Sequence, residues 1–263
     1  MNKYFVKQYG AERTGTNVLR LLLKKRFLNI EVLMHTLGDK HSLPIDYDSL
    51  KENLKQLDDP YEEIYWETIN RPSLTTDVTD QAQTEYLRTI SYELARAILE
   101  NRLFFFISIK HPYSWIYSFL KHQHMLSGQW AGKNYLYLVK VCKSFNRRYA
   151  SWMTLLEKFP EKTYFIRFED LLNNPEDLAI AIRTKFQLQE DNESPFLVHN
   201  VVNPTHWDNS DNSVDIESFD KDFYTSHAYY NFLTPQIVEV VNNSIDWALM
   251  ERYGYHDSIP QCP

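Results

Sequence analysis

The sequence has few cysteines, no long apolar run and no excess of positive charge. Its two cysteines, Cys142 and Cys262, lie far apart, so neither a disulfide framework nor a zinc-binding spacing is predicted, and a reducing, cytoplasmic location is expected. The strongest apolar run, residues 103–109, is too short to span a bilayer, so no membrane insertion is expected. The formal net charge of −7 argues against a general nucleic-acid binder, which needs a broad basic face. Any anion-binding site must therefore be local.

The chain does have enough apolar and aromatic material for one sizeable core. Of its 263 residues, 43% are hydrophobic and 15% are aromatic. This length and composition suit a single domain that includes residues 1–263. No repeat, low-complexity tract or linker divides the chain.

Apolar runs alternate with longer helical patterns, which is typical of βαβ units and a mostly parallel sheet. The run at 103–109 has no polar alternation, as expected of a central strand buried on both faces. Strands are predicted at residues 4–9, 30–35, 103–109 and 162–168, with a further short strand at 62–70. Helices are predicted at residues 17–27, 48–57, 80–101, 113–126, 133–159 (as one helix or two), from Pro175 onward, and at 234–253. The expected fold class is therefore α/β, with three α/β/α layers around a mostly parallel sheet.

A loop with two glycines connects the first predicted strand to the first predicted helix. In an open parallel sheet, ligands bind at the carboxyl ends of the strands, and residues 10–17, GAERTGTN, lie there. Gly10 and Gly15 allow close backbone approach, and the amides at the helix start offer donors and partial positive charge to an anion. A glycine-containing turn between a strand and a helix is also common without a ligand, so this pattern alone leaves both interpretations open.

The loop departs from the phosphate-binding loop of kinases and NTPases. Both glycines of the GxxxxGK[ST] pattern are present, but Thr16 stands at the lysine position and Asn17 at the magnesium-binding hydroxyl position. Such a loop is poorly suited to metal-assisted phosphoryl transfer. Arg13 instead provides a forked cation for terminal oxygens, and Thr14, Thr16 and Asn17 provide neutral donors.

The segment ERTGTN resembles the first motif of the sulfotransferases that use 3′-phosphoadenosine 5′-phosphosulfate (PAPS). In that motif a strand, a [K/R][S/T]GT[T/N]-type loop and a helix hold the 5′-phosphosulfate. The resemblance covers residues 3 to about 186, and residues 232–255 look like the closing helix of bacterial members. It implies a P-loop-NTPase-like sulfotransferase fold and PAPS as a co-substrate without a metal. The residues that it implies for the 5′-phosphosulfate are Arg13, Thr14, Gly15, Thr16 and Asn17.

Two further motifs of this family have counterparts in the sequence. In the second motif a basic residue at a strand end and a serine eight positions later bind the 3′-phosphate, and Lys110 and Ser118 have this spacing, with lysine in place of the more usual arginine. In the third, an aromatic residue before Glu-Asp lies near the adenine, and Phe168 stands there. A lysine that merely ends a strand and a phenylalanine of the core are the alternative interpretations. The RKG-type segment that adds 3′-phosphate contacts has no recognisable counterpart in residues 195–230.

In-line sulfuryl transfer requires a base for the acceptor, cations for the leaving phosphate, and exact placement. Arg13 is predicted to stabilise the leaving group electrostatically, because arginine does not readily donate a proton. The loop at residues 35–42, HTLGDKHS, is expected to carry the base, and His41 is favoured, with Lys40 placed to contact the sulfuryl oxygens. A surface histidine is the alternative interpretation of His41. The other candidates are His35, Asp39, His122, His124, His199 and His206.

The resemblance therefore implies a PAPS-dependent sulfotransferase that acts on a hydroxyl of a saccharide or another small molecule. No nucleic-acid partner is expected, and the oligomeric state is not predicted. Two alternative functions stay open. One is a P-loop nucleotide-dependent kinase, which needs a lysine where Thr16 stands. The other is a non-catalytic nucleotide-binding protein that keeps the loop without an acceptor site.

Overall fold

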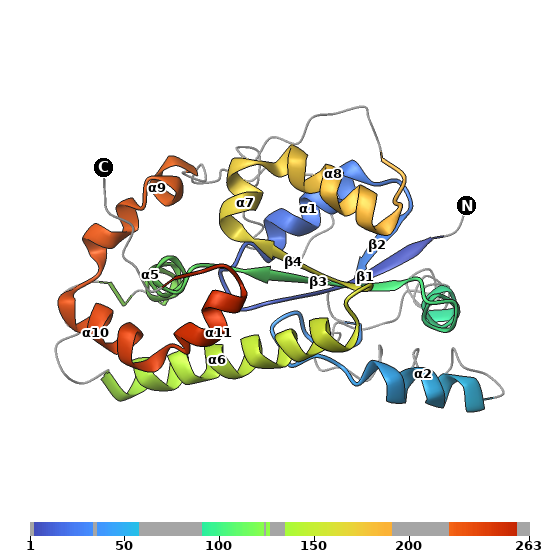
Figure 1. The fold of residues 1–263 in the computed structure, drawn as a ribbon, viewed down its shortest axis with the longest axis horizontal. Helices are drawn as coiled ribbons and strands as arrows, with labels where there is room; N and C mark the ends of the chain where they lie inside the picture. The colour runs from blue at the N-terminus through green and yellow to red at the C-terminus, as the bar shows by residue number, and fades with distance from the viewer. Residues whose placement is uncertain are drawn as a thin grey trace, which may run out of the picture.

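The structure is a computed structural model, and it describes residues 3–33, 36–57, 91–123, 125–126, 135–190 and 221–256. Its described part contains a four-stranded sheet in the order β2-β1-β3-β4, in which every neighbouring pair is parallel (Figure 1). The strands are β1 (Tyr4–Gly10), β2 (Ile30–Leu33), β3 (Leu103–Ile109) and β4 (Thr163–Arg167). The predicted α/β fold with a parallel sheet is confirmed.

The central strand β3 separates two hydrophobic cores. All seven of its residues are buried. The side chains at 103, 105, 107 and 109 belong to one core, and those at 104 and 106 belong to the other. A strand covered by helices on both faces has no side exposed to solvent, which explains why six of its seven residues are apolar; Ser108 is the exception.

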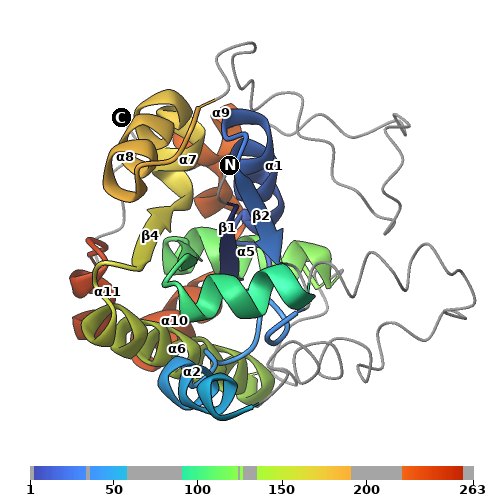
Figure 2. The same ribbon diagram turned by 90° about the vertical axis from the view of Figure 1, so that its right-hand side faces the viewer.

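Helices cover both faces of the sheet and complete three layers (Figures 1 and 2). One face carries α1 (Thr16–Arg26), α7 (Phe168–Asn173) and α8 (Pro175–Phe186). The other face carries α2 (Tyr47–Gln56), α5 (Pro112–His122), α6 (Tyr135–Lys158), α10 (Pro235–Ser244) and α11 (Trp247–Arg252). The short helix α9 (Lys221–Thr225) and the 3-10 helix η3 (Ala228–Phe232) precede α10. Within the described ranges, no helix is both long and apolar enough to cross a membrane.

The single closing helix predicted over residues 234–253 is wrong, because the chain forms α10 and α11 with a break between them. Asn146 of α6 explains the break. Its side chain donates to the carbonyl of Ser244 at 2.8 Å and accepts from the amide of Asp246 at 3.1 Å. The Asp246 carboxylate then caps α11 by accepting from the amide of Leu249 at 3.0 Å. A tertiary contact thus satisfies backbone groups that a continuous helix would have paired internally.

Other element boundaries differ less from the predictions. The strand predicted at 162–168 ends at Arg167, and Phe168 begins α7 instead. The helix predicted at 113–126 ends at His122, and α6 is one continuous helix. Of the helix predicted at 80–101, residues 91–99 are helical, whereas the strand predicted at 62–70 lies outside the described residues.

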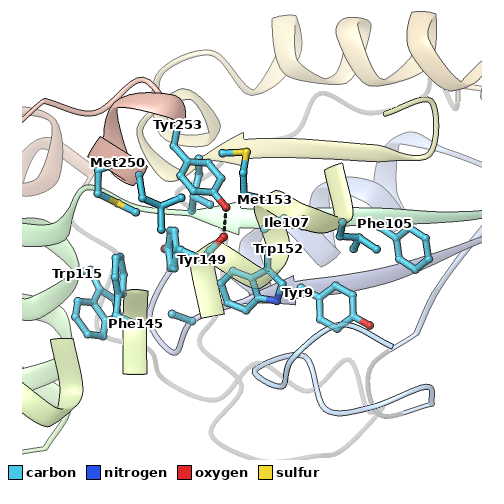
Figure 3. Close-up of a cluster of buried hydrophobic side chains, with 14 of the residues drawn as sticks. Tyr9, Phe105, Ile107, Trp115, Phe145, Tyr149, Trp152, Met153, Met250 and Tyr253 are labelled. Carbon is cyan, nitrogen blue, oxygen red and sulfur yellow. Dashed lines mark hydrogen bonds between the residues drawn. The ribbon is translucent and has the colours of Figure 1, made fainter. Parts of the chain in front are cut away.

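An aromatic cluster between α6 and the sheet supports the carboxyl end of β3 (Figure 3). Tyr149 stacks on Phe145 with ring centroids 3.9 Å apart and lies 5.2 Å from Trp152. Its backbone carbonyl accepts from the hydroxyl of Tyr253 at 2.5 Å, which ties the end of α11 to α6. The Tyr149 hydroxyl accepts from the amide of Lys110 at 3.3 Å, directly after β3. The hydrophobic core therefore extends to the edge of the sheet where the predicted site lies.

Replacing Trp152 by alanine should greatly destabilise the protein. Trp152 is fully buried, and its truncation leaves a large cavity, so we expect the free energy of unfolding to fall by about 3–5 kcal/mol. Urea denaturation measures this loss. Leu136→Ala in the same helix is the control, because Leu136 is 72% exposed and should change stability by less than about 0.5 kcal/mol. Similar losses in the two variants would contradict the packing described for α6.

Candidate functional site

The loop between β1 and α1 contains glycines where its packing leaves no room for side chains. A Cβ atom on Gly10 would lie 2.7 Å from Thr14 Oγ1, and one on Gly15 would lie 2.6 Å from the ring of Phe168. Gly15 also has a left-handed backbone, with φ of 81°, which glycine adopts without steric cost. Arg13 is left-handed as well, with φ of 68°, and backbone strain of this kind concentrates at functional sites. The loop is a tight bend that leads directly into α1.

Buried polar side chains hold this bend from inside the sheet. Gln8 of β1 donates to the carbonyl of Thr16 at 2.6 Å, and Ser108 of β3 donates to the carbonyl of Thr14. The Thr14 hydroxyl donates to the carbonyl of Ala11 at 2.8 Å, and both threonines are buried. The Thr14 hydroxyl, which the sequence predicts as a ligand donor, is therefore engaged within the loop.

The start of α1 and the side chain of Arg13 provide donors for an anion. Among the described residues no side chain caps α1, and the first amides of a helix have no partner within the helix. Arg13 is exposed, and its guanidinium makes no hydrogen bond or ion pair with any residue that the structure describes. Together with the positive end of the helix dipole, these groups suit a phosphate or sulfate group.

Lys110 and Ser118 lie together next to this loop. Lys110 Nζ donates to Ser118 Oγ at 2.8 Å and lies 3.5 Å from the carbonyl oxygen of Arg13. The rings of Phe168 and Tyr224 flank the ammonium, with centroids 4.0 Å and 4.1 Å away. The second motif and the loop thus form one continuous site, and the aromatic groups around Lys110 come from α7 and α9.

The environment of Lys110 favours its neutral form. The side chain is 1% exposed, and this burial lowers the pKa of Lys110 well below its usual 10.5; the nearby Arg13 cation lowers it further, and Glu169 opposes the shift. The Glu169 carboxylate is itself held by the hydroxyl of Tyr255 at 2.6 Å and the amide of His111 at 3.2 Å. An anion bound beside Lys110 would restore the charged form.

A buried lysine of β1 positions the second predicted loop, and sequence reasoning did not identify it as part of the site. Lys7 is fully buried, and its ammonium donates to the carbonyls of Thr36, at 3.0 Å, and Gly38. The amide of Gly10 donates to the carbonyl of Lys40 at 2.9 Å. These bonds bring the segment after β2 alongside the anion-binding loop. The available sequence signal was two polar residues, Lys7 and Gln8, in the middle of a strand whose other side chains are apolar or aromatic.

His41 is arranged as a neutral hydrogen-bond acceptor. Its Nδ1 lies 2.6 Å from the carbonyl oxygen of Gly10. Because a carbonyl only accepts, Nδ1 carries the hydrogen, and in the neutral ring Nε2 is left with a lone pair. Burial is the main cause that lowers the pKa of His41 below its usual 6.5. The imidazole is therefore suited to accept a proton at neutral pH.

Lys40 and Asn17 contact each other at the start of α1. Lys40 Nζ donates to Asn17 Oδ1 at 2.8 Å. Burial lowers the pKa of Lys40, and the Arg20 guanidinium lowers it further. The Lys40 side chain, which the sequence predicts as a contact of the sulfuryl oxygens, therefore lies next to residues predicted to hold the 5′-phosphosulfate.

Phe168 lies beneath the loop as part of the second core. It is 3% exposed, it contacts the position of Gly15, and Lys110 lies over its ring. Its predicted proximity to an adenine stays a prediction.

Of the other candidate bases, His122 lies on the exposed end of α5 and Asp39 accepts from the amide of His41 at 2.8 Å. The remaining candidates, His35, His124, His199 and His206, lie outside the described residues.

A cavity of about 170 Å³ adjoins the loop at Glu12. Its walls include Trp115 and Phe119 of α5 and Phe145 of α6. Arg148 pairs with the Glu12 carboxylate at 2.6 Å, and the indole of Trp115 donates to the Glu12 carbonyl at 3.0 Å. The cavity thus combines an aromatic wall with one ion pair.

In the described part of the chain, no group of three or more His, Cys, Asp or Glu side chains is arranged to hold a metal ion.

Comparison with known proteins found similarity at the level of structure only. No protein-family model matches the chain, and no curated protein matches it significantly. Among solved structures, the sulfotransferase domain of the Synechococcus PCC 7002 olefin synthase is 14% identical, with a TM-score of 0.48 over 98% of this chain and 95% of that one. The sulfotransferase domain from the curacin biosynthetic pathway is 13% identical, with a TM-score of 0.41 over 92% and 97%. Similarity this low does not determine function, which must rest on the residues of the site.

The buried Lys110 should make stability depend on pH. In the unfolded chain lysine keeps its proton until about pH 10.5, whereas the folded protein releases it at lower pH. Between these two pKa values the unfolded state binds more protons, so the stability that Lys110 contributes rises with pH. From about pH 7.5 to about pH 9.5, the wild type should gain stability relative to Lys110→Met, by at most about 1.4 kcal/mol per pH unit.

Urea unfolding of both proteins at the two pH values measures this gain. Lys24→Met is the matched control, because Lys24 lies on the exposed surface of α1. Its stability difference from the wild type should be the same at both pH values. A Lys110→Met difference that is equally constant would show that the Lys110 ammonium is not held in a desolvated environment.

Proposed function

We propose that this protein is a sulfotransferase that uses PAPS to sulfate a hydroxyl of a small-molecule acceptor. The proposal rests chiefly on the position of Lys110. Its ammonium lies 2.8 Å from Ser118 Oγ and 3.5 Å from the carbonyl oxygen of Arg13, so two separate anion-binding features meet at one sheet edge. PAPS carries anionic groups at both its 5′ and 3′ positions, and it fits a site with two such features.

The residues present suit the two ends of this donor. The first amides of α1 and the exposed Arg13 guanidinium would hold the 5′-phosphosulfate, with Lys40 beside them. Lys110 and Ser118 would hold the 3′-phosphate. Each contact between a charged donor and a phosphate oxygen contributes about 1.5–3 kcal/mol. Binding at both ends also orients the sulfuryl group relative to the second loop.

The proposed reaction uses one base and a set of fixed cations. PAPS, when bound, supplies the activated sulfuryl group. His41 Nε2 accepts the proton of the acceptor hydroxyl, because its Nδ1–H is already donated to the Gly10 carbonyl. Arg13 and the first amides of α1 stabilise the charge that develops on the leaving 5′-phosphate. Lys40 is placed to neutralise the sulfuryl oxygens during transfer.

Glu12 is a less suitable base than His41. Its carboxylate is held by Arg148 at 2.6 Å, and hydrogen bonding and charge from Arg148 help to lower the pKa of Glu12 despite the opposing effect of burial. A carboxylate with a lowered pKa has little tendency to take a proton at neutral pH.

The cavity at Glu12 is the proposed entrance for the acceptor. The rings of Trp115 and Phe119 offer flat apolar surfaces on which an aromatic ring or the face of a sugar can pack. The acceptor class in this proposal is therefore a small hydroxyl compound with such a surface, and saccharides are one example.

Binding of the spent donor, adenosine 3′,5′-bisphosphate (PAP), should stabilise the folded protein, whereas ATP with magnesium should not. Ligand at about 100 times its Kd adds about 2.7 kcal/mol by mass action, which a thermal-shift assay detects as a higher Tm. Arg13→Ala should lose most of the PAP-induced shift while keeping the Tm of the free protein, because Arg13 is exposed.

Stabilisation by ATP with magnesium alone would instead support the kinase alternative. Stabilisation by PAP in a protein that turns over no acceptor would support the alternative of a non-catalytic nucleotide-binding protein.

Substitution of His41 should abolish most of the activity. We expect His41→Gln and His41→Ala to lower kcat by about 10²–10⁴-fold, because general base catalysis is lost. In the wild type, kcat should rise with pH and level off below the usual histidine pKa of 6.5, because burial lowers the pKa of His41 and only the neutral ring accepts a proton. Turnover measured from about pH 4.5 to about pH 8 tests both points.

His122→Gln distinguishes His41 from a rival candidate. It should keep the wild-type kcat and the same pH profile, since His122 lies on the exposed end of α5. Loss of activity in His122→Gln together with normal rates in both His41 variants would transfer the role of base to His122.

A further inference from the structure

We propose that Tyr224 of α9 is a third ligand of the nucleotide 3′-phosphate and a determinant of selectivity for 3′-phosphorylated nucleotides. This inference rests on the proposed function, which assigns the 3′-phosphate to Lys110 and Ser118. Tyr224 belongs to none of the three motifs that the sequence resembles. It lies in the region, residues 195–230, where the RKG-type segment has no counterpart.

Tyr224 contacts both residues of the assigned phosphate site. Its hydroxyl oxygen lies 3.1 Å from Ser118 Oγ, and its ring centroid lies 4.1 Å from Lys110 Nζ. The ring packs edge-on against Phe168, with centroids 5.4 Å apart and an interplanar angle of 87°. The tyrosine is therefore held by its ring, and its hydroxyl is directed to the same place as the Lys110 ammonium.

The hydrogen bonds of Ser118 determine the direction in which the Tyr224 hydroxyl donates. Ser118 has one hydroxyl proton, which it donates to the carbonyl of Ser114 at 3.0 Å. It accepts from Lys110 Nζ at 2.8 Å. With its only proton used, Ser118 is the acceptor in the remaining contact, and Tyr224 is the donor. Lys110 and Tyr224 thus both donate to one oxygen, Ser118 Oγ.

A phosphate oxygen can take the place of Ser118 Oγ as the acceptor for these two donors. Neither side chain then needs a new backbone position, because an ammonium and a phenol each redirect their hydrogens by rotation. The rings of Phe168 and Tyr224 already limit where the Lys110 ammonium can lie. Little side-chain entropy is therefore lost when the phosphate binds.

The chemistry of a phosphate group explains why a third donor is needed. A phosphate monoester presents three terminal oxygens. Lys110 provides one charged donor, and Ser118 adds a neutral donor only if its hydroxyl turns from the Ser114 carbonyl to the phosphate. Lysine is a point charge without the two-pronged geometry of arginine, so it discriminates poorly by direction. A hydroxyl from a separate element adds direction without adding charge. Tyr224 thereby takes over contacts that a basic segment would otherwise supply.

A purely structural role for Tyr224 makes a different prediction. If Tyr224 only packed against Phe168 and Phe223, loss of its hydroxyl would affect nucleotides with and without a 3′-phosphate equally. If the hydroxyl binds the 3′-phosphate, only the bisphosphate would be affected. The ratio of two dissociation constants therefore separates ligand binding from packing.

The experiment measures the Kd of PAP and of adenosine 5′-monophosphate by calorimetry for the wild type, Tyr224→Phe and Tyr230→Phe. Tyr224→Phe keeps the ring that packs on Phe168 and Lys110. It should weaken PAP binding about tenfold and leave the affinity for the monophosphate within about twofold. Tyr230→Phe is the matched control, because the Tyr230 hydroxyl is buried without a hydrogen-bond partner in the described structure. It should leave both affinities unchanged.

The outcomes separate this inference from the function on which it rests. A wild type that prefers PAP, with the same preference in Tyr224→Phe, would overturn the role of Tyr224 and leave the proposed function intact. Equal weakening of both nucleotides in Tyr224→Phe would also overturn it, in favour of packing. A wild type that shows no preference for PAP would overturn both. Thermal unfolding of the free variants verifies that each is folded before binding is measured.

Discussion

The burial of the Lys110 ammonium is the constraint on which the candidate site depends. Taking a lysine charge out of water is costly unless other groups compensate it. Here Ser118 accepts its hydrogen bond at 2.8 Å, the rings of Phe168 and Tyr224 flank it at 4.0 Å and 4.1 Å, and Glu169 opposes its loss of charge. These groups come from α5, α7 and α9, so one buried lysine side chain links three elements at the end of β3. These groups do not fully offset the cost of burying the charge, because the pKa of Lys110 is still lowered. An anion bound beside the lysine would supply the missing compensation.

The register of the parallel sheet places the other parts of the site around this lysine. Gly10 at the end of β1 lies opposite Ser108 of β3, so the loop after β1 and the residues after β3 end at the same level. Lys7 and the amide of Gly10 then hold the segment after β2 against that loop through backbone carbonyls. Cations and the candidate base therefore reach one edge of the sheet from three different strands.

The loop has the shape of a phosphate-binding loop but different chemical groups. Where kinases have a lysine, Thr16 is buried, and its carbonyl accepts from Gln8. The next residue, Asn17, uses its side-chain oxygen to accept from Lys40. The same bend also determines the tautomer of His41, because the Gly10 carbonyl accepts its Nδ1–H. In the proposed function, these groups would serve the transfer of a sulfuryl group to a hydroxyl acceptor, with the neutral imidazole of His41 as the base.

The sequence by itself determined the features that depend on neighbours along the chain. The parallel strands, the glycine loop and the proximity of Lys110 to Ser118 follow from local patterns, since a strand that runs into a helix brings residues eight apart close together. Only the tertiary structure decided that Lys7 anchors the second loop, that Asn146 separates α10 from α11, and that Tyr224 completes the surroundings of Lys110. The physical reason is that these contacts join residues far apart in the chain. Their formation depends on how the helices pack on the sheet, which no local pattern of residues specifies.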